Sequence, residues 1–210
     1  MFRGCIICIG TVLEVGTSSF VVQAAKAAGN IEEGQTVCID GCRLCVEKLT
    51  GDTIEMTLSE ETHRRTTFDT VQPGDRVNVE ILFRLGDTYD GHLVQGHVDA
   101  VGKVLRVDEQ GKSRRVWIRP PKRFLDNLIA KGSVAVDGVS LTLTEILQDR
   151  FSVALVPSTM KAGSLGEIET GDRVNLEYDM IGKLAARYEN QAAAALSAVL
   201  GNMPWSGSRE

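Results

Sequence analysis

The heptapeptide Gly74-Asp75-Arg76-Val77-Asn78-Val79-Glu80 recurs 97 residues later as Gly171-Asp172-Arg173-Val174-Asn175-Leu176-Glu177, with one conservative change. The same offset aligns Asp40-Gly41 with Asp137-Gly138. Nearer the N-terminus the offset becomes 92, which places Gly4 on Gly96 and implies five extra residues in the second copy. Because self-similarity at a fixed spacing is the signature of a repeat architecture, the sequence predicts an internal duplication.

The duplication sets the domain organisation. The copies are predicted to span residues 1–85 and 92–180, and each has the size of a small domain of about 90 residues. Hydrophobic residues make up 43% of the chain and charged residues 24%, which is the balance of an ordinary globular protein. A helix over 181–200 and a flexible tail over 201–210 are expected to follow the second copy.

Each copy has the sequence pattern of a small β-barrel. Asp40-Gly41 and Asp137-Gly138 are hairpin signals, because this dipeptide tolerates the positive φ angles of a tight primed turn. Residues 53–58 and 151–155 alternate like half-buried strands, and a short helix is expected near Pro121. Several short strands with closely spaced turn signals favour closed barrels, so we expect a mostly β fold of two tandem Greek-key barrels.

The predicted C-terminal helix carries an apolar stripe at helical spacing, which must be buried somewhere. It could fold back on its own domain or pack against partner copies as a subunit interface, and the second arrangement is favoured here. The stripe consists of Leu184, Ala185, Tyr188, Ala192, Ala195, Leu196 and Val199.

Charge and composition limit which binding partners and which cellular compartment are expected. The net charge of -5 disfavours nucleic acid, because phosphate binding requires a clustered basic surface. No apolar run approaches the ~20 residues that cross a bilayer, and no leader precedes the first strand. We therefore expect a cytoplasmic protein without membrane contact.

All five cysteines lie in the first copy, in a pattern that superficially resembles a metal site. Cys5 and Cys8, and again Cys42 and Cys45, have the C-x-x-C spacing of zinc ligands. Residues three apart on a strand point to opposite faces, and the second copy has no equivalent ligand set. We therefore expect no metal and mostly buried, reduced thiols, with redox sensing and zinc as the alternatives.

Several motifs together resemble riboflavin synthase. They are Met1-Phe2-x-Gly4, Gly91-His92-Leu93-Val94-Gln95-Gly96-His97-Val98-Asp99, Asp137-Gly138-Val139-Ser140-Leu141-Thr142, and the repeated heptapeptide with Asp179 after it. The similarity extends in order from Met1 to about Tyr188. It implies two six-stranded barrels that each bind a lumazine, and a homotrimer joined through the C-terminal helix. The active site would form between the first barrel of one subunit and the second barrel of another.

The resemblance also implies a reaction. One 6,7-dimethyl-8-ribityllumazine donates a four-carbon unit to a second, which gives riboflavin and a ribitylaminopyrimidine without a metal or organic cofactor. His97 is the candidate for proton handling, because imidazole titrates near neutral pH. Ser140 and Thr142 share one strand face and can hydrogen-bond a bound ring, and Asp179 resembles the family's active-site acid. The candidate ligand-binding residues are Phe2, Arg3, Gly4, Thr36, Arg43, Cys45, Thr62, Thr142 and Thr159.

The duplication exposes a difference between the two copies. By the repeat, Ser140 corresponds to Arg43, and Thr142 corresponds to Cys45. The family usually has a catalytically important cysteine at the position of Arg43 and a threonine at the position of Cys45. Arg3 likewise replaces a usual threonine, and Cys42 would point to the wrong face to substitute for the missing cysteine. The leading interpretation is a riboflavin synthase-like enzyme. The alternative is a non-catalytic or repurposed lumazine- or flavin-binding protein whose first barrel accepts an anionic or modified ligand.

Overall fold

The computed structural model describes residues 1–84, 86–185 and 188. The first copy forms six strands, which are β1 (Cys8–Val15), β2 (Ser19–Gln23), β3 (Thr36–Ile39), β4 (Cys42–Thr50), β5 (Thr53–Thr57) and β6 (Arg76–Ile81). Its short helices are α1 (Ala25–Ala28) and α2 (Glu60–Arg65), followed by the 3-10 turn η1 (Thr67–Asp69).

The second copy repeats this order. Its strands are β7 (Ala100–Gln110), β8 (Ser113–Arg119), β9 (Ser133–Val136), β10 (Val139–Ile146), β11 (Phe151–Leu155) and β12 (Arg173–Tyr178). Its helices are α3 (Lys122–Leu125), α4 (Pro157–Ala162) and the 3-10 turn η2 (Ser164–Glu167). The longer strands β7 and β8 take up the five extra residues that the changed offset predicted.

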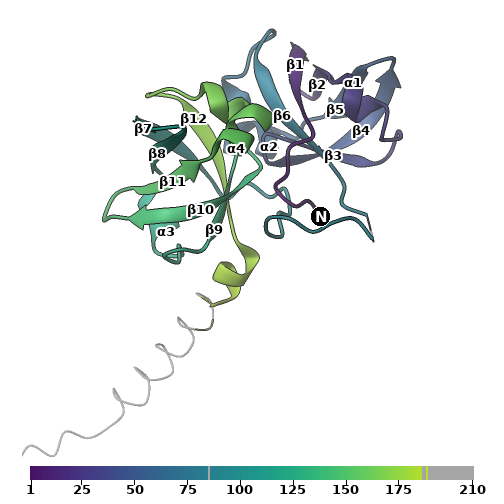
Figure 1. The fold of residues 1–210 in the computed structure, drawn as a ribbon. Helices are drawn as coiled ribbons and strands as arrows, with labels where there is room; N and C mark the ends of the chain where they lie inside the picture. Colours follow the sequence, from purple (N-terminus) through teal and green to yellow (C-terminus); the bar gives the residue numbers. More distant parts are fainter. Residues whose placement is uncertain (85, 186–187, 189–210) are drawn as a thin grey trace, which may run out of the picture.

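Both copies close into antiparallel barrels of identical topology. The strand order is β1-β2-β5-β4-β3-β6 in the first and β7-β8-β11-β10-β9-β12 in the second. In each, three hairpin-connected strands are flanked by a fourth that returns beside the first of them, which is a Greek key. The prediction of two tandem six-stranded barrels is therefore confirmed (Figure 1).

Each barrel has its own hydrophobic core, produced by the alternation of side chains along its strands. In β4 the side chains of Cys42, Leu44 and Val46 are buried, whereas Arg43 and Cys45 face outward. The corresponding second-barrel strand, β10, follows the same alternation. Outward-facing positions of these two strands are therefore free to take part in a binding site.

The barrels meet where their two Asp-Gly turns touch. Asp40 and Asp137 have φ angles of 42° and 43°, as primed hairpin turns require. A Cβ added to Gly41 would lie 2.7 Å from the backbone nitrogen of Gly138, so only glycine allows this approach. Asn78 and Asn175 connect the barrels reciprocally: the Asn78 amide donates to the Asp137 carbonyl and the Asn175 amide to the Asp40 carbonyl.

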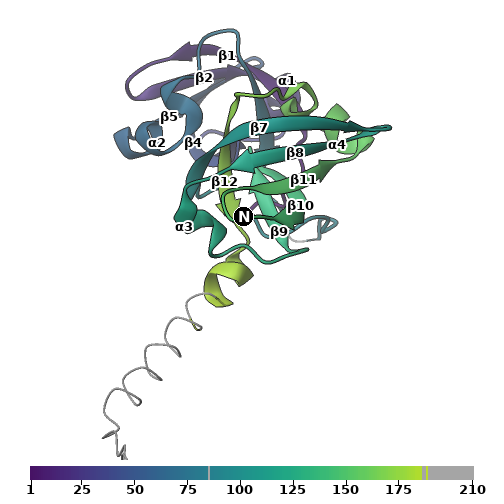
Figure 2. The same cartoon turned by 90° about the vertical axis from the view of Figure 1, so that its left-hand side faces the viewer.

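The chain after β12 begins the predicted C-terminal helix, which leaves the second barrel in both views (Figure 1, Figure 2). Residues 180–185 and 188 are helical. Ile181, Leu184 and Tyr188 are 70%, 54% and 64% exposed, so this apolar stretch has no cover within the described chain. The rest of the predicted helix, and the predicted tail over 201–210, lie outside the described residues.

Candidate functional site

The segment that precedes each barrel crosses to the other barrel. The N–H of Ser140 donates to the Gly4 carbonyl at 2.9 Å, and the N–H of Arg43 donates to the Gly96 carbonyl at 2.9 Å. Gly4 and Gly96 both have positive φ angles, of +73° and +80°. A Cβ on either would lie 2.6 Å from the Cβ of Ser140 or Arg43, so glycine is required for the close contact.

The crossing at residues 4–6 forms a groove on the outer face of β10, which we call the second groove. We call the repeat-equivalent surface on the outer face of β4 the first groove. The second groove is bounded by β10, residues 4–6 and α4, and it contains a cavity of about 320 Å³. That volume lies within the range of small-molecule sites. The lining residues are Gly4, Cys5, Ile6, Asp90, Gly91, Val139, Ser140, Ser158, Thr159 and Ala162.

A buried histidine holds the hydroxyl at the floor of the second groove. His92 Nδ1 lies 2.7 Å from Ser140 Oγ, and His92 is only 6% exposed. Its Nε2 is buried and has no partner among the described residues. Burial lowers the pKa of His92, against the opposing charge of Asp179, so the imidazole is neutral at pH 7. His92 belongs to the Gly91–Asp99 motif that the sequence analysis singled out. Its spacing from Ser140 did not predict that the two side chains are paired.

His97 lies elsewhere, in a loop held by a buried carboxylate. Glu177 accepts hydrogen bonds from the backbone N–H groups of Gln95, Gly96 and His97 at 2.7, 2.9 and 2.9 Å. Burial raises the pKa of Glu177 to about 7 even though these N–H groups favour its charged form. The His97 side chain is exposed on the loop that crosses to Arg43, so it belongs to the first groove.

Glu80 plays the same role in the first copy. Its carboxylate accepts the N–H of Arg3 at 2.8 Å and that of Gly4 at 3.1 Å. Burial raises its pKa as well. The last residue of each repeated heptapeptide thus fixes the crossing segment of its own barrel, a role that the sequence did not reveal.

By the internal repeat, the first-barrel equivalents of the second groove's walls are β4, residues 96–98 and α2. Arg43 and Cys45 face outward on β4, and Thr62 lies on α2. Ser59 caps this helix: its hydroxyl accepts the Thr62 N–H at 3.0 Å and lies 2.8 Å from the Thr62 hydroxyl. Thr36 is half-buried beside Cys45 in the β3–β4 pairing, and its Oγ1 has no partner among the described residues.

Two predicted ligand-binding residues near the N-terminus have structural contacts. Phe2 is fully buried, pairs with Val94 through a β-bridge and packs in a small core with Cys38 and Ala135. Arg3 donates from Nη1 to the Thr88 carbonyl at 2.7 Å and lies 5.6 Å from the centre of the Phe83 ring. Arg3 is thereby directed to the segment that joins the barrels rather than to Arg43.

The other predicted residues lie in the second barrel. Thr159, on α4, lines the second groove, and Thr142 is exposed on the same face of β10 as Ser140. Asp179 directly follows β12 and accepts the N–H of Ile181 at 3.0 Å. Its charge acts on His92, so the structure brings Asp179 into the neighbourhood of the Ser140–His92 pair.

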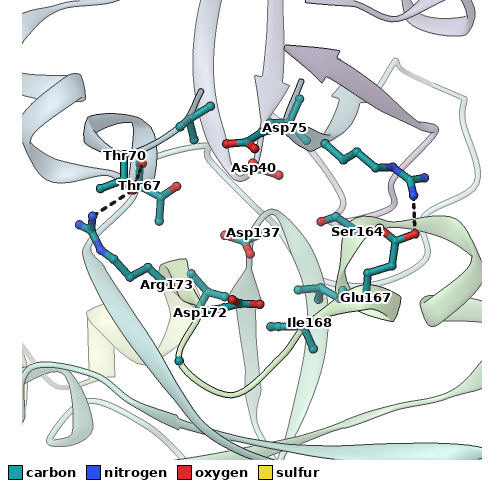
Figure 3. Close-up of a pocket in the computed structure, with 16 residues that line it drawn as sticks. Asp40, Thr67, Thr70, Asp75, Asp137, Ser164, Glu167, Ile168, Asp172 and Arg173 are labelled. Atoms are coloured by element: carbon teal, nitrogen blue, oxygen red, sulfur yellow. Dashed lines mark hydrogen bonds and ion pairs between the residues drawn. The ribbon is translucent and has the colours of Figure 1, made fainter. Parts of the chain in front are cut away.

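A separate cavity of about 510 Å³ lies between the barrels (Figure 3). Asp40 and Asp137 face each other across it, and each accepts the N–H of an asparagine, Asn78 or Asn175, at 2.7 Å. Burial raises the pKa of Asp40 to about 7, and burial together with the charge of Asp40 raises that of Asp137 well above its usual value. None of the residues that line this cavity also lines the cavity on the outer face of β10, so we assign it no part in the second groove.

The five cysteines are free thiols. Cys38 and Cys42 are buried, Cys5 and Cys8 are half-buried, and Cys45 is exposed. Cys42 and Cys45 indeed face opposite sides of β4. Within residues 1–84, 86–185 and 188, no three His, Cys, Asp or Glu side chains are grouped so that they could hold a metal ion. In the same part of the chain, no helix has the length and apolarity needed to cross a bilayer.

Two antiparallel barrels in tandem, with a groove of this size on one of them, define a tandem-barrel protein that has a candidate small-molecule site. The family model for the lumazine binding domain matches twice, over residues 3–81 and 95–179. Riboflavin synthase of Photobacterium phosphoreum is 33% identical over 192 residues, 89% of this chain and 88% of that protein. The enzyme of Escherichia coli K12 is 33% identical over 150 residues, 71% and 70% of the two chains. The chain therefore belongs to the lumazine-binding family that includes the riboflavin synthases.

Solved structures agree on the fold. LumP complexed with riboflavin superposes with a TM-score of 0.79 at 24% identity, over 84% of this chain and 98% of that one. LumP complexed with 6,7-dimethyl-8-(1'-D-ribityl) lumazine gives a TM-score of 0.77 at 23% identity, over 85% and 99%.

Proposed function

We propose that the protein is a riboflavin synthase-type transferase, which converts two molecules of 6,7-dimethyl-8-ribityllumazine into riboflavin and a ribitylaminopyrimidine. The observation that carries this proposal is the second groove, where the Ser140 hydroxyl faces a cavity of about 320 Å³ and is held from behind by buried His92. The family membership and the groove size support a lumazine as its occupant.

The chemistry of the reaction matches these groups. The lumazine must lose a proton from its C7 methyl group, and the resulting anion is spread over the ring. A neutral His92 can accept the Ser140 hydrogen bond or donate to Ser140 Oγ, so the hydroxyl can be turned to meet the charge on the ligand. Ser140 is therefore proposed to touch the ring, and His92 to be a positioning residue. His97 and Asp179 remain our candidates for proton handling and for the acid.

The two grooves supply the second requirement, which is that two ligands meet. Bringing two copies of one substrate into fixed proximity removes much of the entropic barrier of their reaction. A homotrimer would place the first groove of one subunit against the second groove of another, and the exposed residues Ile181, Leu184 and Tyr188 offer an apolar contact for it. The mass of the full chain in solution, measured by light scattering, tests the trimer. The proposed reaction needs no cofactor beyond the two substrate molecules.

The experiment is riboflavin formation from purified lumazine, followed by fluorescence. We expect turnover in the wild type and a loss of about 10²-fold in Ser140→Ala, as for removal of one preorganised donor. Thr144→Ala, on the same outward face of β10 but outside the groove lining, is the matched control. Equal rates in wild type and Ser140→Ala would contradict the proposed role of the second groove.

A second candidate function is a protein that holds a lumazine or flavin without turning it over. Arg43 favours it, because the equivalent position in the second groove carries Ser140, and a guanidinium is larger and charged. A stoichiometric yellow chromophore that persists without turnover would support this function. Arg43→Cys then separates the two: a large gain of riboflavin formation would show that the first groove has departed from the ancestral reaction.

A further inference from the structure

The cavity between the barrels is built from the same positions of both repeat copies. Asp40 and Asp137, which face each other in it, are separated by the repeat offset (Figure 3). The same offset relates six further pairs of its lining residues. They are Thr67 with Ser164, Thr70 with Glu167, Val71 with Ile168, Asp75 with Asp172, Arg76 with Arg173, and Val77 with Val174. The cavity therefore has two similar halves, and a ligand that matches it has two similar ends.

The charge of this cavity is predominantly negative. Its two cations are already paired: Arg76 forms an ion pair with Glu167, and Arg173 forms one with Asp69 at 2.8 Å. The other carboxylates of the lining form no ion pair with any described residue. They are Asp40, Asp75, Asp137 and Asp172. Four carboxylates without a cation around one cavity favour a positively charged occupant.

The two central aspartates each keep one oxygen free. Asp40 and Asp137 are only 8% and 9% exposed. In each, Oδ1 accepts a backbone N–H at 2.7 Å, from Asn78 or Asn175, and Oδ2 accepts no hydrogen bond from a described residue. A buried carboxylate is costly unless a donor or a cation meets it. The two Oδ2 atoms therefore point to a ligand that carries positive charge and donates hydrogen bonds.

The carboxylates are divided between the two halves of the cavity. Besides burial, the charge of Asp75 raises the pKa of Asp40. Burial and the charges of Asp40 and Asp172 likewise raise the pKa of Asp137. Each half thus has one buried and one exposed carboxylate that interact, Asp40 with Asp75 and Asp137 with Asp172.

A single metal ion does not fit this arrangement. In the described part of the chain, no three His, Cys, Asp or Glu side chains are grouped so that they could hold one. The carboxylates instead surround a cavity of about 510 Å³ that also has an apolar lining. The apolar side chains are Val71, Val77, Leu165, Ile168 and Val174. Separated charges together with apolar surface match an alkyl chain that has a cationic group at each end.

We propose that the cavity between the barrels binds a linear diamine, with one ammonium group in each half and the alkyl chain against the apolar lining. An ammonium group has three donors and no acceptor, so one can meet Asp40 and Asp75 while the other meets Asp137 and Asp172. No residue lines both this cavity and that of the second groove, so the inference does not depend on the proposed function.

The test is isothermal titration calorimetry of the full chain at pH 8 with 1,4-diaminobutane. The controls are 1-aminobutane, which has one ammonium group, and Mg²⁺. We expect the diamine to bind about 10-fold more tightly than the monoamine or better, as for one added hydrogen bond to a charged group. Asp40→Asn and Asp137→Asn keep an oxygen for the asparagine N–H but remove a charge, and each should weaken the diamine by about 10-fold. Asp126→Asn, at an exposed aspartate outside the cavity, should leave the affinity unchanged.

The dependence on pH provides a readout that altered packing would not move. The charged groups that face the cavity are Asp40, Asp75, Asp137, Glu167, Asp172, Arg76 and Arg173. Because the pKa of Asp40 is raised to about 7, protonation competes with the diamine as the pH falls, and the affinity should drop by about 10-fold between pH 8 and pH 6. The double variant Asp40→Asn, Asp137→Asn should lose this dependence.

The remaining outcomes would overturn the inference. Equal affinities for the diamine and the monoamine would show that no ligand bridges the two halves. Diamine binding that is unchanged in Asp40→Asn, Asp137→Asn and the exposed-rim variant Asp75→Asn would place it elsewhere on the protein. Tighter binding of Mg²⁺, lost in the same variants, would make the cavity a metal site. Absence of any diamine binding would refute the proposal directly, and it would leave riboflavin formation as a separate question.

Discussion

Gly4 offers a direct test of how the crossing segment builds the second groove. In Gly4→Ala the new Cβ would lie 2.6 Å from both Cβ and N of Ser140, and the backbone is held at a φ of +73°. The positive φ alone costs an alanine about 1 kcal/mol. Relief of the overlap adds about 2 kcal/mol, as for overpacking of a tight site with loss of one hydrogen bond. The free energy of unfolding should therefore fall by about 3 kcal/mol.

Gly34→Ala is the matched control for this prediction. Gly34 has a φ of +84°, but nothing lies within 4 Å of its added Cβ, so only the backbone cost of about 1 kcal/mol applies. Urea denaturation gives both free energies, and fluorescence titration gives the lumazine affinity. We expect a loss of affinity of at least 10-fold in Gly4→Ala and none in Gly34→Ala. If the two variants lose the same stability, the close contact with Ser140 is not what requires glycine.

Two further predictions concern the buried carboxylates. Burial raises the pKa of Asp40 to about 7, so its favourable contribution to stability is present at low pH and is lost as pH rises toward 7. Asp40→Asn keeps an oxygen for the Asn78 N–H but has no charge to bury. Its free energy of unfolding should therefore rise by about 2 kcal/mol relative to that of the wild type when the pH is raised from 5 to 8. Thermal unfolding at both pH values measures this difference, and a difference that does not change with pH would contradict the prediction. Glu177→Ala leaves three backbone N–H groups unpaired and should cost about 3 kcal/mol, measured by urea denaturation against the exposed control Glu14→Ala. A cost below about 1 kcal/mol would mean that water replaces the carboxylate.

The strand and turn pattern was predictable because it depends on local chemistry. Asp-Gly at 40–41 and 137–138 predicted primed turns, and both aspartates have the required positive φ. Alternation along β4 correctly separated buried Cys42 from exposed Cys45. The repeat then predicted that both copies would share one topology, which they do.

The composition of the grooves was less accessible, because it depends on contacts between residues remote in the chain. Ser140 and His92 are 48 residues apart, and they meet because the segment between β6 and β7 places His92 against β10. Phe2 and Arg3 were predicted as ligand-binding residues from the family resemblance, and the fold buries the first and turns the second to Phe83 and Thr88.

By itself, the sequence determined that this protein is a duplicated, mostly β chain of the lumazine-binding family, because repetition and alternation depend only on the order of residues along the chain. Only the tertiary structure decided that each copy's N-terminal segment completes the other copy's groove. That exchange depends on two close backbone contacts, at Gly4 and Gly96, which no periodicity encodes.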